Sequence, residues 1–565
     1  MRIALAQQNY RIGDIAGNTD KILAAIQTAK EAGAGLILFS ELAITGYPPR
    51  DLLEFKEFID ACERSLEQIR LSASGIGVVV GAPQRNPFTT GKRLFNAAYL
   101  FDEQQLVGVV QKTCLPTYDI FDEYRYFEPA REWSVLSFRG KKLAITICED
   151  IWNLGDHPLY PQCPLDHLMG QQPDLILNLS ASPFDYTHLE DRKAILKQNV
   201  RKYQKPFLYC NAVGSQTEIV FDGGSLVMDA EANLILQLPL FEESIRYVDW
   251  MEDGRFAQPI LVPSEQLPDA EYNPDTLKAE EGIAEIYQAL VLGIRDYFQK
   301  MGFREAILGS SGGVDSAVTL ALAVAALGKE HVRAVLMPSP FSSTHSVTDA
   351  KSLSERLGNP FDIVPIERVF DSFLTELKPL FADRPFGLAE ENMQSRIRGN
   401  FLMSIANKFG YILLNTSNKS ELATGYGTLY GDMAGGLAVL GDCYKRQVYA
   451  LARYINREKE IIPESILTKD PSAELRPNQK DSDSLPDYSV LDPILYQYIE
   501  GRKGPETIIA QGYQRSLVER VIRLVNVNEY KRNQFCPIIR VSPKAFGMGR
   551  RMPIVAQYLT DMPKT

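Results

Sequence analysis

The sequence lacks the features that mark secreted, membrane-spanning and zinc-binding proteins. No stretch of about eighteen consecutive apolar residues occurs, so no membrane-spanning helix is predicted. The opening residues, MRIALAQQNY, turn polar before an apolar leader could form. The 7 cysteines include no CxxC pair and only 5 histidines accompany them, so neither a disulfide framework nor a Cys/His zinc site is expected. We therefore expect a cytoplasmic protein without a membrane partner.

An excess of positive charge is also missing. The chain carries 71 acidic and 60 basic residues, a formal net charge of −11, which argues against binding to nucleic acid. Its 565 residues are enough for two to four domains of roughly 150 residues each. The hydrophobic content of 45% is ordinary for a globular protein.

The chain divides into two α/β halves joined by a linker. Residues 256–282 hold four prolines and many acidic residues with little periodicity, which predicts a linker between domains at 1–255 and 283–565. The second half opens with a long amphipathic helix at 283–302. In the first half, helical segments alternate with buried strands predicted at RIALAQQ (2–8), GLILFSE (35–41), IGVVVGAP (76–83), KLAITICED (142–150), DLILNLSAS (174–182) and PFLYCNAVG (206–214).

A glycine-serine turn in the second half has the form of an anion site. The stretch ILGSSGGVDS, residues 307–316, reads as a strand, a tight turn and the start of an apolar helix. Backbone N–H groups of such a turn point at one spot and favour an anion. No lysine follows the glycines, so the lysine-bearing phosphate loop does not fit. The plainer alternative is a turn that caps a core helix, with Asp315 and Ser316 as helix-end residues.

The motif SGGxDS resembles that of the ATP-pyrophosphatase, or PP-loop, family. Members cleave ATP between its α- and β-phosphates, and the turn holds the departing pyrophosphate. The resemblance implies that Asp315 binds Mg²⁺ during the transfer. It also implies ATP contacts from Gly309, Ser310, Ser311, Gly312, Gly313, Val314, Asp315 and Ser316.

Three further stretches of the second half resemble the NAD synthetase family. They are EENMQSRIRGNFLMSIAN (390–407), LLNTSNKSELATGYGTLYGDMAG (413–435) and NEYKRNQ (528–534). In that family ATP activates the carboxylate of deamido-NAD and ammonia then displaces AMP. Arg396 and Arg398 are equally compatible with phosphate contacts and with an ordinary exposed helix face. Leu429 stands where some ammonia-dependent members carry a lysine.

The NAD synthetase resemblance assigns roles residue by residue. It implies that Glu421 shares Mg²⁺ with Asp315, since two carboxylates suit a hard cation. Further ATP contacts would come from Thr416, Lys445 and Ser472. Contacts with deamido-NAD would come from Asn392, Glu421 and Lys531.

Three stretches of the first half resemble the nitrilase/amidase superfamily, and they imply the catalytic residues Glu41, Lys112 and Cys148. Cys148 would be the nucleophile, Glu41 its base, and Lys112 the group that stabilises thiolate and oxyanion. Taken singly, a cysteine at the end of an apolar strand is more often a core residue. The stretches are FSELAITGYPPRDLL (39–53), QKTCLPTYDIFDEYRYFEP (111–129) and LAITICEDIWN (143–153).

Glutamine-dependent members of that superfamily suggest where glutamine binds. The resemblance implies Tyr118 and Ser182 as contacts. A lysine or arginine usually follows six residues after the serine, whereas this chain has His188. A protonated histidine can still meet a carboxylate.

Together the resemblances imply an α/β protein with a glutaminase domain that supplies ammonia to a synthetase domain. The first half would be an αββα nitrilase-like sandwich, and the second a doubly wound parallel-sheet domain like that of adenine nucleotide alpha hydrolases. The substrates would be glutamine, ATP and deamido-NAD, and the family suggests a homo-oligomer. Three alternatives remain open: a first half that is only a scaffold, a different acid as acceptor, and a nucleotide-sensing module without catalysis.

Overall fold

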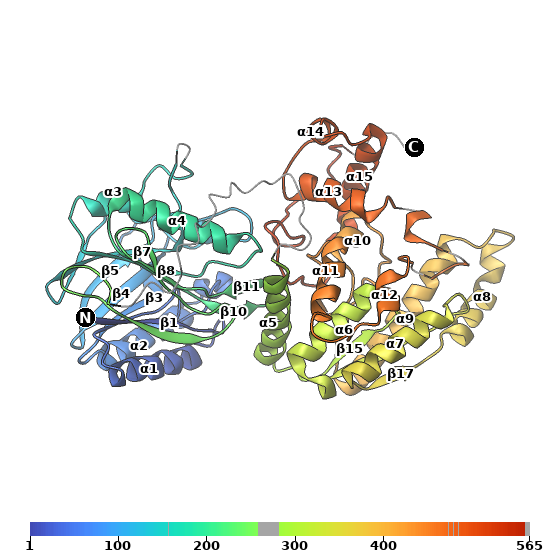
Figure 1. The fold of residues 1–565 in the computed structure, drawn as a ribbon, viewed down its shortest axis with the longest axis horizontal. Coiled ribbons are helices and arrows are strands. Elements are labelled where there is room, and N and C mark those ends of the chain that lie inside the picture. The colour runs from blue at the N-terminus through green and yellow to red at the C-terminus, as the bar shows by residue number, and fades with distance from the viewer. Residues whose placement is uncertain (156–157, 258–281, 473, 478, 484, 560–565) are drawn as a thin grey trace. The chain divides into compact units, whose positions relative to one another are not determined.

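The computed structural model forms two compact units, Met1–Asp269 and Ala270–Thr565 (Figure 1). It describes residues 1–155, 158–257, 282–472, 474–477, 479–483 and 485–559. Most of the predicted linker, 256–282, therefore lies outside the described residues. Its first two residues still bond to the first unit, where Phe256 forms a bridge with Trp250 and the Ala257 amide donates to the Asp249 carbonyl.

The first unit is built from two six-stranded mixed sheets with a helix layer on each outer side (Figure 1). One sheet has the order β14-β1-β2-β3-β4-β5 and the other β13-β12-β9-β8-β7-β6. The first sheet comprises β1 (Arg2–Gln7), β2 (Leu36–Leu38), β3 (Gly77–Arg85), β4 (Leu94–Asp102), β5 (Gln105–Gln111) and β14 (Ser244–Asp249). The second comprises β6 (Leu136–Phe138), β7 (Lys141–Ile147), β8 (Leu175–Ser180), β9 (Phe207–Asn211), β12 (Leu226–Met228) and β13 (Leu234–Gln237).

Helices and short pieces complete the first unit. Helices α1 and α2 pack on the first sheet, and α3 and α4 pack on the second. This arrangement confirms the predicted αββα sandwich. The elements are α1 (Ile15–Glu31), α2 (Lys56–Ser72), α3 (Pro164–Met169), α4 (His188–Tyr203), the hairpin of β10 (Val213–Gln216) and β11 (Ile219–Asp222), and the 3-10 turns η1 (Arg50–Glu54), η2 (Glu123–Arg125) and η3 (Cys148–Ile151).

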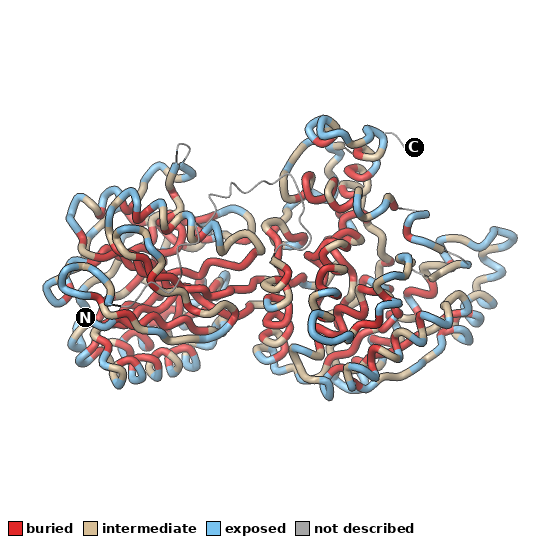
Figure 2. The backbone as a smooth tube through the Cα atoms, viewed as in Figure 1, coloured by how far each residue is buried: buried red, intermediate tan, exposed pale blue. Residues whose placement is uncertain are grey.

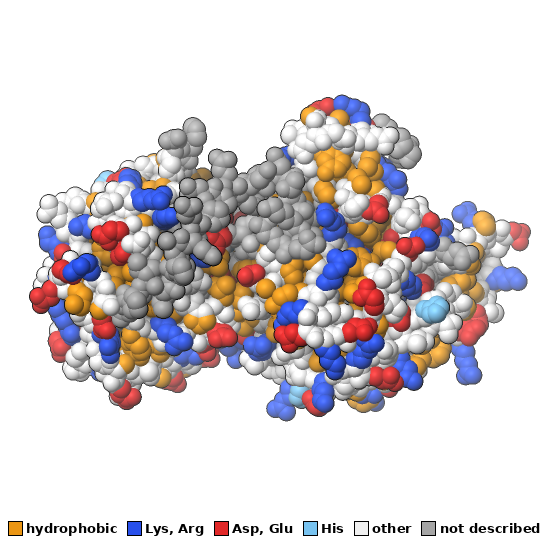
Figure 3. All heavy atoms as spheres, viewed as in Figure 1, with side chains coloured by type: hydrophobic (Ala, Val, Ile, Leu, Met, Phe, Trp, Pro, Cys, Tyr) orange, Lys and Arg blue, Asp and Glu red, His pale blue; other side chains and the backbone are white. Residues whose placement is uncertain are grey.

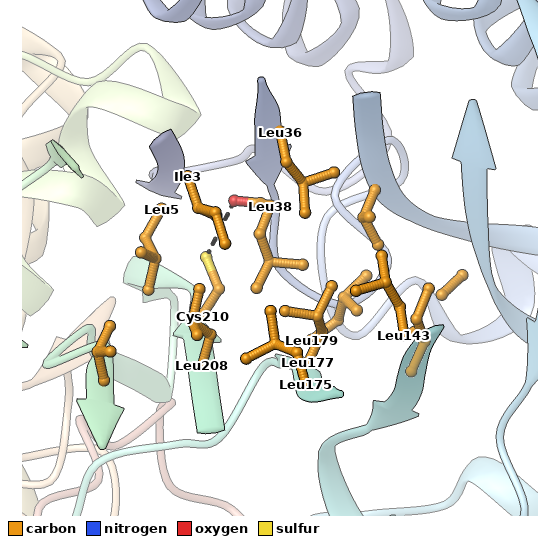
Figure 4. Packing of buried hydrophobic residues seen from close by; sticks show 14 of the residues in the cluster. Ile3, Leu5, Leu36, Leu38, Leu143, Leu175, Leu177, Leu179, Leu208 and Cys210 are labelled. Carbon is orange, nitrogen blue, oxygen red and sulfur yellow. Dashed lines mark hydrogen bonds between the residues drawn. The ribbon is translucent and has the colours of Figure 1, made fainter. Parts of the chain in front are cut away.

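The core of the first unit lies between its two sheets. Leu36 and Leu38 of β2 face Leu177 and Leu179 of β8 across this layer (Figure 4). Cys210 of β9 belongs to the same layer, and its thiol donates to the Leu38 carbonyl at 3.4 Å. Alternating strand residues point to opposite faces, so the other half of each strand packs against the helices. Figure 2 shows the buried strands enclosed by exposed helix surfaces.

The second unit contains one parallel five-stranded sheet of order β17-β16-β15-β18-β19. Helix α6 packs on β15 and β16, and α9 packs on β15 and β18. The strands are β15 (Ala306–Gly309), β16 (Val332–Leu336), β17 (Phe361–Ile363), β18 (Ile412–Asn415) and β19 (Leu437–Ala438). The main helices are α5 (Ile283–Met301), α6 (Val314–Leu327), α7 (Thr344–Leu357), α8 (Glu367–Phe381), α9 (Leu388–Phe409), α10 (Lys419–Thr424) and α11 (Lys445–Ile455).

The C-terminal part adds a helical layer to the second unit. Helices α13 (Tyr488–Ile499), α14 (Pro505–Ile509) and α15 (Arg515–Val527) share a core cluster with α10 and with Tyr444. Helix α16 (Glu529–Arg532) follows α15, and α12 (Glu464–Thr468) and the 3-10 turn η5 (Asp481–Asp483) precede α13. A further 3-10 turn, η4 (Lys329–His331), lies between α6 and β16. The doubly wound parallel fold predicted for this half is confirmed.

The surface agrees with the charge balance of the sequence. On the face drawn in Figure 3, acidic and basic side chains of the described residues are interspersed. Within the described ranges, no helix is long and apolar enough to cross a membrane.

A close backbone approach in the first unit generates a stability prediction. A Cβ atom at Gly81 of β3 would lie 2.4 Å from the Leu42 amide nitrogen, so Gly81→Ala must push two backbone segments apart. Overpacking of this kind costs about 1–3 kcal/mol. We expect the calorimetric unfolding transition of the first unit to move to lower temperature. Gly170→Ala is the control, because its Cβ would meet nothing closer than 3.5 Å. Equal transitions for the two variants would contradict the prediction.

Two candidate active sites

Lys112 lies at the centre of the first site, held between two carboxylates. Its Nζ atom donates to Glu41 Oε1 and to Glu123 Oε1, both at 2.7 Å. Lys112 directly follows β5, and Glu41 lies three residues beyond the end of β2. Asn96 of β4 donates to Glu41 Oε1 at 2.7 Å and to Glu123 Oε2 at 3.3 Å. All four side chains are buried, so their positions are fixed by one another.

Cys148 begins η3 at the end of β7 with a φ of 44°, a backbone conformation that non-glycine residues adopt rarely. The carboxylate of Asp150 holds this turn. It accepts from the Ile147 amide at 3.0 Å and from the amides of Thr113 and Cys114 at 3.0 and 2.8 Å. The turn that carries the cysteine is thereby tied to the segment that carries the lysine.

Burial decides the resting protonation of this site. It raises the pKa of the Cys148 thiol well above its ordinary value, and the charge of Glu41 adds to this while Lys112 opposes it. Burial alone would lower the pKa of Lys112, but Glu123 and Glu41 outweigh it and hold that pKa well above the usual range. The pKa of Glu123 is raised by burial. The resting site therefore contains a neutral thiol and a charged lysine, and the thiol needs a base to become a nucleophile.

Residues predicted to bind glutamine fall into two small groups. Tyr118 donates its hydroxyl to Glu149 at 2.8 Å, and burial raises the pKa of that carboxyl to about 7. Ser182 Oγ lies 2.9 Å from His188 Nε2, and the His188 ring stacks on Trp152 with centroids 5.1 Å apart. Glu149 directly follows Cys148, so the Tyr118 group lies next to the nucleophile.

The second site is a cavity of about 280 Å³ lined by the whole turn from Gly309 to Ser316. The turn connects β15 to α6, and the Ser316 hydroxyl donates to the Gly313 carbonyl at 3.0 Å. Gly312 has a φ of 79°, and a Cβ there would lie 2.3 Å from the Ser346 carbonyl oxygen. Only glycine fits at this position, which lets the amides of the turn line the cavity.

Two carboxylates and a lysine meet beside this turn. Asp315 accepts from Asn418 Nδ2 at 2.8 Å and from Lys445 Nζ, and Lys445 Nζ lies 3.8 Å from Glu421 Oε1. Burial, followed by the charge of Asp315, raises the pKa of Glu421 well above its ordinary value. The described residues contain no ready-made group of three or more His, Cys, Asp or Glu side chains for a metal. Two carboxylates nevertheless fit Mg²⁺, because that ion is usually completed by substrate phosphates and water.

The cavity gathers most of the other predicted residues. Thr416, Glu421, Lys445 and Ser472 all line it, and so does Arg398. For Arg396 the sequence left both a phosphate contact and an exposed helix face open. Its side chain is exposed and donates to the Leu429 carbonyl.

The other two residues predicted to bind deamido-NAD, Asn392 of α9 and Lys531 of α16, are not among the described residues that line the cavity. Asn392 accepts from the Thr428 hydroxyl at 2.8 Å, and Lys531 donates to the carbonyls of Gly425 and Gly427 at 2.7 and 2.9 Å. Both side chains therefore hold the stretch that follows α10.

Several site residues escaped the sequence analysis. Glu123 lies inside the quoted stretch 111–129, and Glu149 and Asp150 directly follow Cys148, so proximity to a motif was the available signal. In the second unit, Lys469 and Glu474 line the cavity as an ion pair with a 2.6 Å N–O distance. Both lie within three residues of Ser472, so proximity to a predicted residue was again the available signal.

Comparison with known families identifies both halves of the chain. A carbon-nitrogen hydrolase profile matches residues 2–253, and an NAD synthase profile matches residues 286–535. The chain is therefore a carbon-nitrogen hydrolase domain fused to an NAD synthase domain. Two curated relatives, both described as glutamine-dependent NAD(+) synthetases, match over nearly their whole lengths. The one from Synechocystis sp. is 44% identical, over 98% of this chain and 99% of its own. The one from Thermotoga maritima is 41% identical, over 99% of each chain.

A solved structure extends the match to three dimensions. The glutamine-dependent NAD+ synthetase from Acinetobacter baumannii, in complex with ADP, is 39% identical with a TM-score of 0.76 and covers 99% of both chains. The chain belongs to the glutamine-dependent NAD(+) synthetase family.

The shared lysine in the first site generates a prediction. Glu123→Gln keeps the shape of the side chain and removes one of the two negative charges that pair with the Lys112 ammonium. We expect glutamate release from glutamine to slow by about tenfold or more, with little change in the KM for glutamine, since neighbours that orient a reacting group have effects of this size. Glu128→Gln is the matched control, because that buried carboxylate bonds to Arg131 and the Lys92 amide instead. Wild-type rates in Glu123→Gln would refute the role.

Proposed function

We propose that this chain forms NAD from deamido-NAD, ATP and glutamine, with the two reactions divided between its two units. It is a carbon–nitrogen ligase with a glutaminase domain. The observation that supports the proposal is that each unit brings a set of predicted reacting residues together. One contains a thiol beside a buried lysine–glutamate pair, and the other a glycine-serine turn beside two carboxylates and a lysine.

In the first unit, Cys148 would attack the side-chain amide carbon of glutamine. Glu41 would take the thiol proton as the C–S bond forms, because the neutral thiol is a weak nucleophile. Lys112 would stabilise the tetrahedral oxyanion. Collapse breaks the C–N bond, the proton passes to the leaving nitrogen, and ammonia departs. Water activated by Glu41 then opens the thioester to give glutamate and restore the thiol.

Glutamine would be oriented by the Tyr118 group and the Ser182–His188 group. We propose that Tyr118 and Ser182 contact it and that His188 meets its carboxylate when protonated. The Ser182–His188 contact supports this, because it fixes the imidazole at a short distance from the serine.

In the second unit, the carboxylate of deamido-NAD would attack the α-phosphorus of ATP. The bond to the β-phosphate breaks, and amides of the turn 309–316 hold the pyrophosphate. Ammonia then attacks the acyl carbon and AMP leaves. Thr416, Lys445 and Ser472 would contact ATP. Asp315 and Glu421 would hold Mg²⁺, which when bound offsets the negative charge of the phosphates. Asn392, Glu421 and Lys531 would contact deamido-NAD.

We also propose a cytoplasmic homo-oligomer as the working form. The 7 cysteines, all within the described ranges, form no disulfide, as expected in a reducing compartment. Sedimentation of the purified chain tests the oligomer.

Removal of the nucleophile tests the division between the two units. Cys148→Ala should abolish NAD formation from glutamine, since no thioester can form. Synthesis from added ammonium should persist at a substantial fraction of the normal rate, because the second site lies entirely in the other unit. NAD and glutamate are measured with each nitrogen source. Continued use of glutamine would mean that Cys148 is not the nucleophile.

Removal of one charge in the turn tests the synthetase site. Asp315→Asn keeps the shape of the side chain but weakens the proposed Mg²⁺ contact and the ion pair with Lys445. NAD formation should be lost with both nitrogen sources, while glutamate release by Cys148 persists. In the wild-type protein the nucleotide products should be AMP and pyrophosphate. ADP and phosphate would overturn the assignment of the turn.

A further inference from the structure

A second buried lysine, Lys419, lies behind the synthetase site rather than in it. It is the first residue of α10 and is completely buried. Its Nζ atom donates to Glu500 Oε1 at 2.7 Å, to Ser542 Oγ at 2.7 Å and to the Lys544 carbonyl at 3.0 Å. Asp442 Oδ1 lies 2.9 Å away as a second ion partner. One ammonium thus joins four segments that are distant in the sequence.

The segment that carries Lys419 contacts both carboxylates of the synthetase site. Directly before Lys419, Asn418 donates its amide to Asp315 and accepts from the backbone of Glu421 at 3.0 Å. On the other side, the ring of Tyr444 lies 4.8 Å from the Lys419 ammonium and directly precedes Lys445. Lys419 is therefore linked through Asn418 and Tyr444 to Asp315, Glu421 and Lys445.

Adjacent contacts lock α10 to the start of α11 as well. The Ser420 hydroxyl donates to Asp492 at 2.6 Å and accepts from the Lys445 amide at 3.0 Å. Asp442 accepts from the amides of Val541 and Ser542 at 2.8 and 2.7 Å. The turn between β19 and α11 is thus bonded to the C-terminal segment that also holds Lys419.

Stability alone does not account for this arrangement. Charged groups lose their hydration on burial, and buried ion pairs replaced by apolar residues often leave a protein as stable or more stable. Buried polar groups that orient a metal-binding side chain, in contrast, affect metal affinity and activity directly.

We propose that Lys419 is a positioning residue of the synthetase site, which fixes the separation between Asp315, Glu421 and Lys445 through α10 and the turn before α11. The inference rests on the proposed function, because it concerns the pair of carboxylates assigned to Mg²⁺. Its role is indirect, since its own ammonium is enclosed by Asp442, Glu500 and the C-terminal segment.

The test replaces the ion cluster without stranding a buried charge. The triple variant is Lys419→Met, Asp442→Asn, Glu500→Gln. It removes the ammonium group with its hydrogen bonds, and it makes both former carboxylate partners neutral. Mg²⁺ binding is measured by calorimetry in the presence of α,β-methylene-ATP, which cannot be cleaved at the α–β bond. We expect about tenfold weaker Mg²⁺ binding and about tenfold slower ammonium-dependent NAD formation.

A matched control separates positioning from loss of stability. Val521→Ala removes volume from the same core cluster that contains Tyr444 and part of α10. It should lower the unfolding temperature while Mg²⁺ binding stays unchanged. Glutamate release measured without ATP and deamido-NAD should be normal in both variants.

The outcomes are distinct from those that test the proposed function. A folded triple variant with wild-type Mg²⁺ binding and rate would overturn the role of Lys419. If the triple variant does not fold, Glu500→Gln serves instead, since it keeps an acceptor for Lys419 and removes one charge. It should weaken Mg²⁺ binding by roughly threefold or more, and unchanged binding would overturn the inference. Failure of the wild-type chain to form AMP and pyrophosphate would instead overturn the proposed function.

Discussion

The pairing of a lysine ammonium with carboxylates in a water-free interior is the constraint on which the first unit depends. Lys112 is wholly buried, and a charge in that position persists only because Glu41 and Glu123 each lie 2.7 Å from it. The two acids come from turns after different elements, so the pair requires the first sheet to bring those turns together. The same burial that makes the ion pair necessary raises the pKa of the Cys148 thiol, so the thiol needs a base, the role proposed for Glu41.

The second unit applies the same physics to a different task. Lys445 is paired with Asp315 inside a cavity, and Lys419 is paired with Asp442 and Glu500 behind it. In both units the reacting groups follow the ends of strands, where backbone amides are not used by the sheet. Cys148 follows β7, and the glycine-serine turn 309–316 follows β15. The two folds therefore place their predicted reacting residues at equivalent positions, and each pairs a buried lysine with carboxylates there.

Local patterns predicted much of this molecule. The six strands expected in the first half are present, although β2 ends at Leu38, so that Glu41 lies beyond the strand rather than at its end. The turn 309–316 was readable because its glycines and serines are contiguous. The contacts of Glu123 and Asp442 were not readable, since they are made with residues that only folding brings near. Tertiary contacts of Asn392 and Lys531 with the segment after α10 were equally invisible in the sequence.

The contact of Gly312 with the backbone of Ser346 has a mechanical consequence. There is no room for even one methyl group between the turn 309–316 and α7 at Gly312. The turn and the first residues of α6 and α7 are therefore packed together as one rigid contact. Relative motion of the two helices would have to break this contact, whereas side chains elsewhere in the cavity wall can rearrange without doing so. For the proposed ATP site, this makes the turn a fixed part of the wall, and any change in the size of the cavity must come from the rest of its lining.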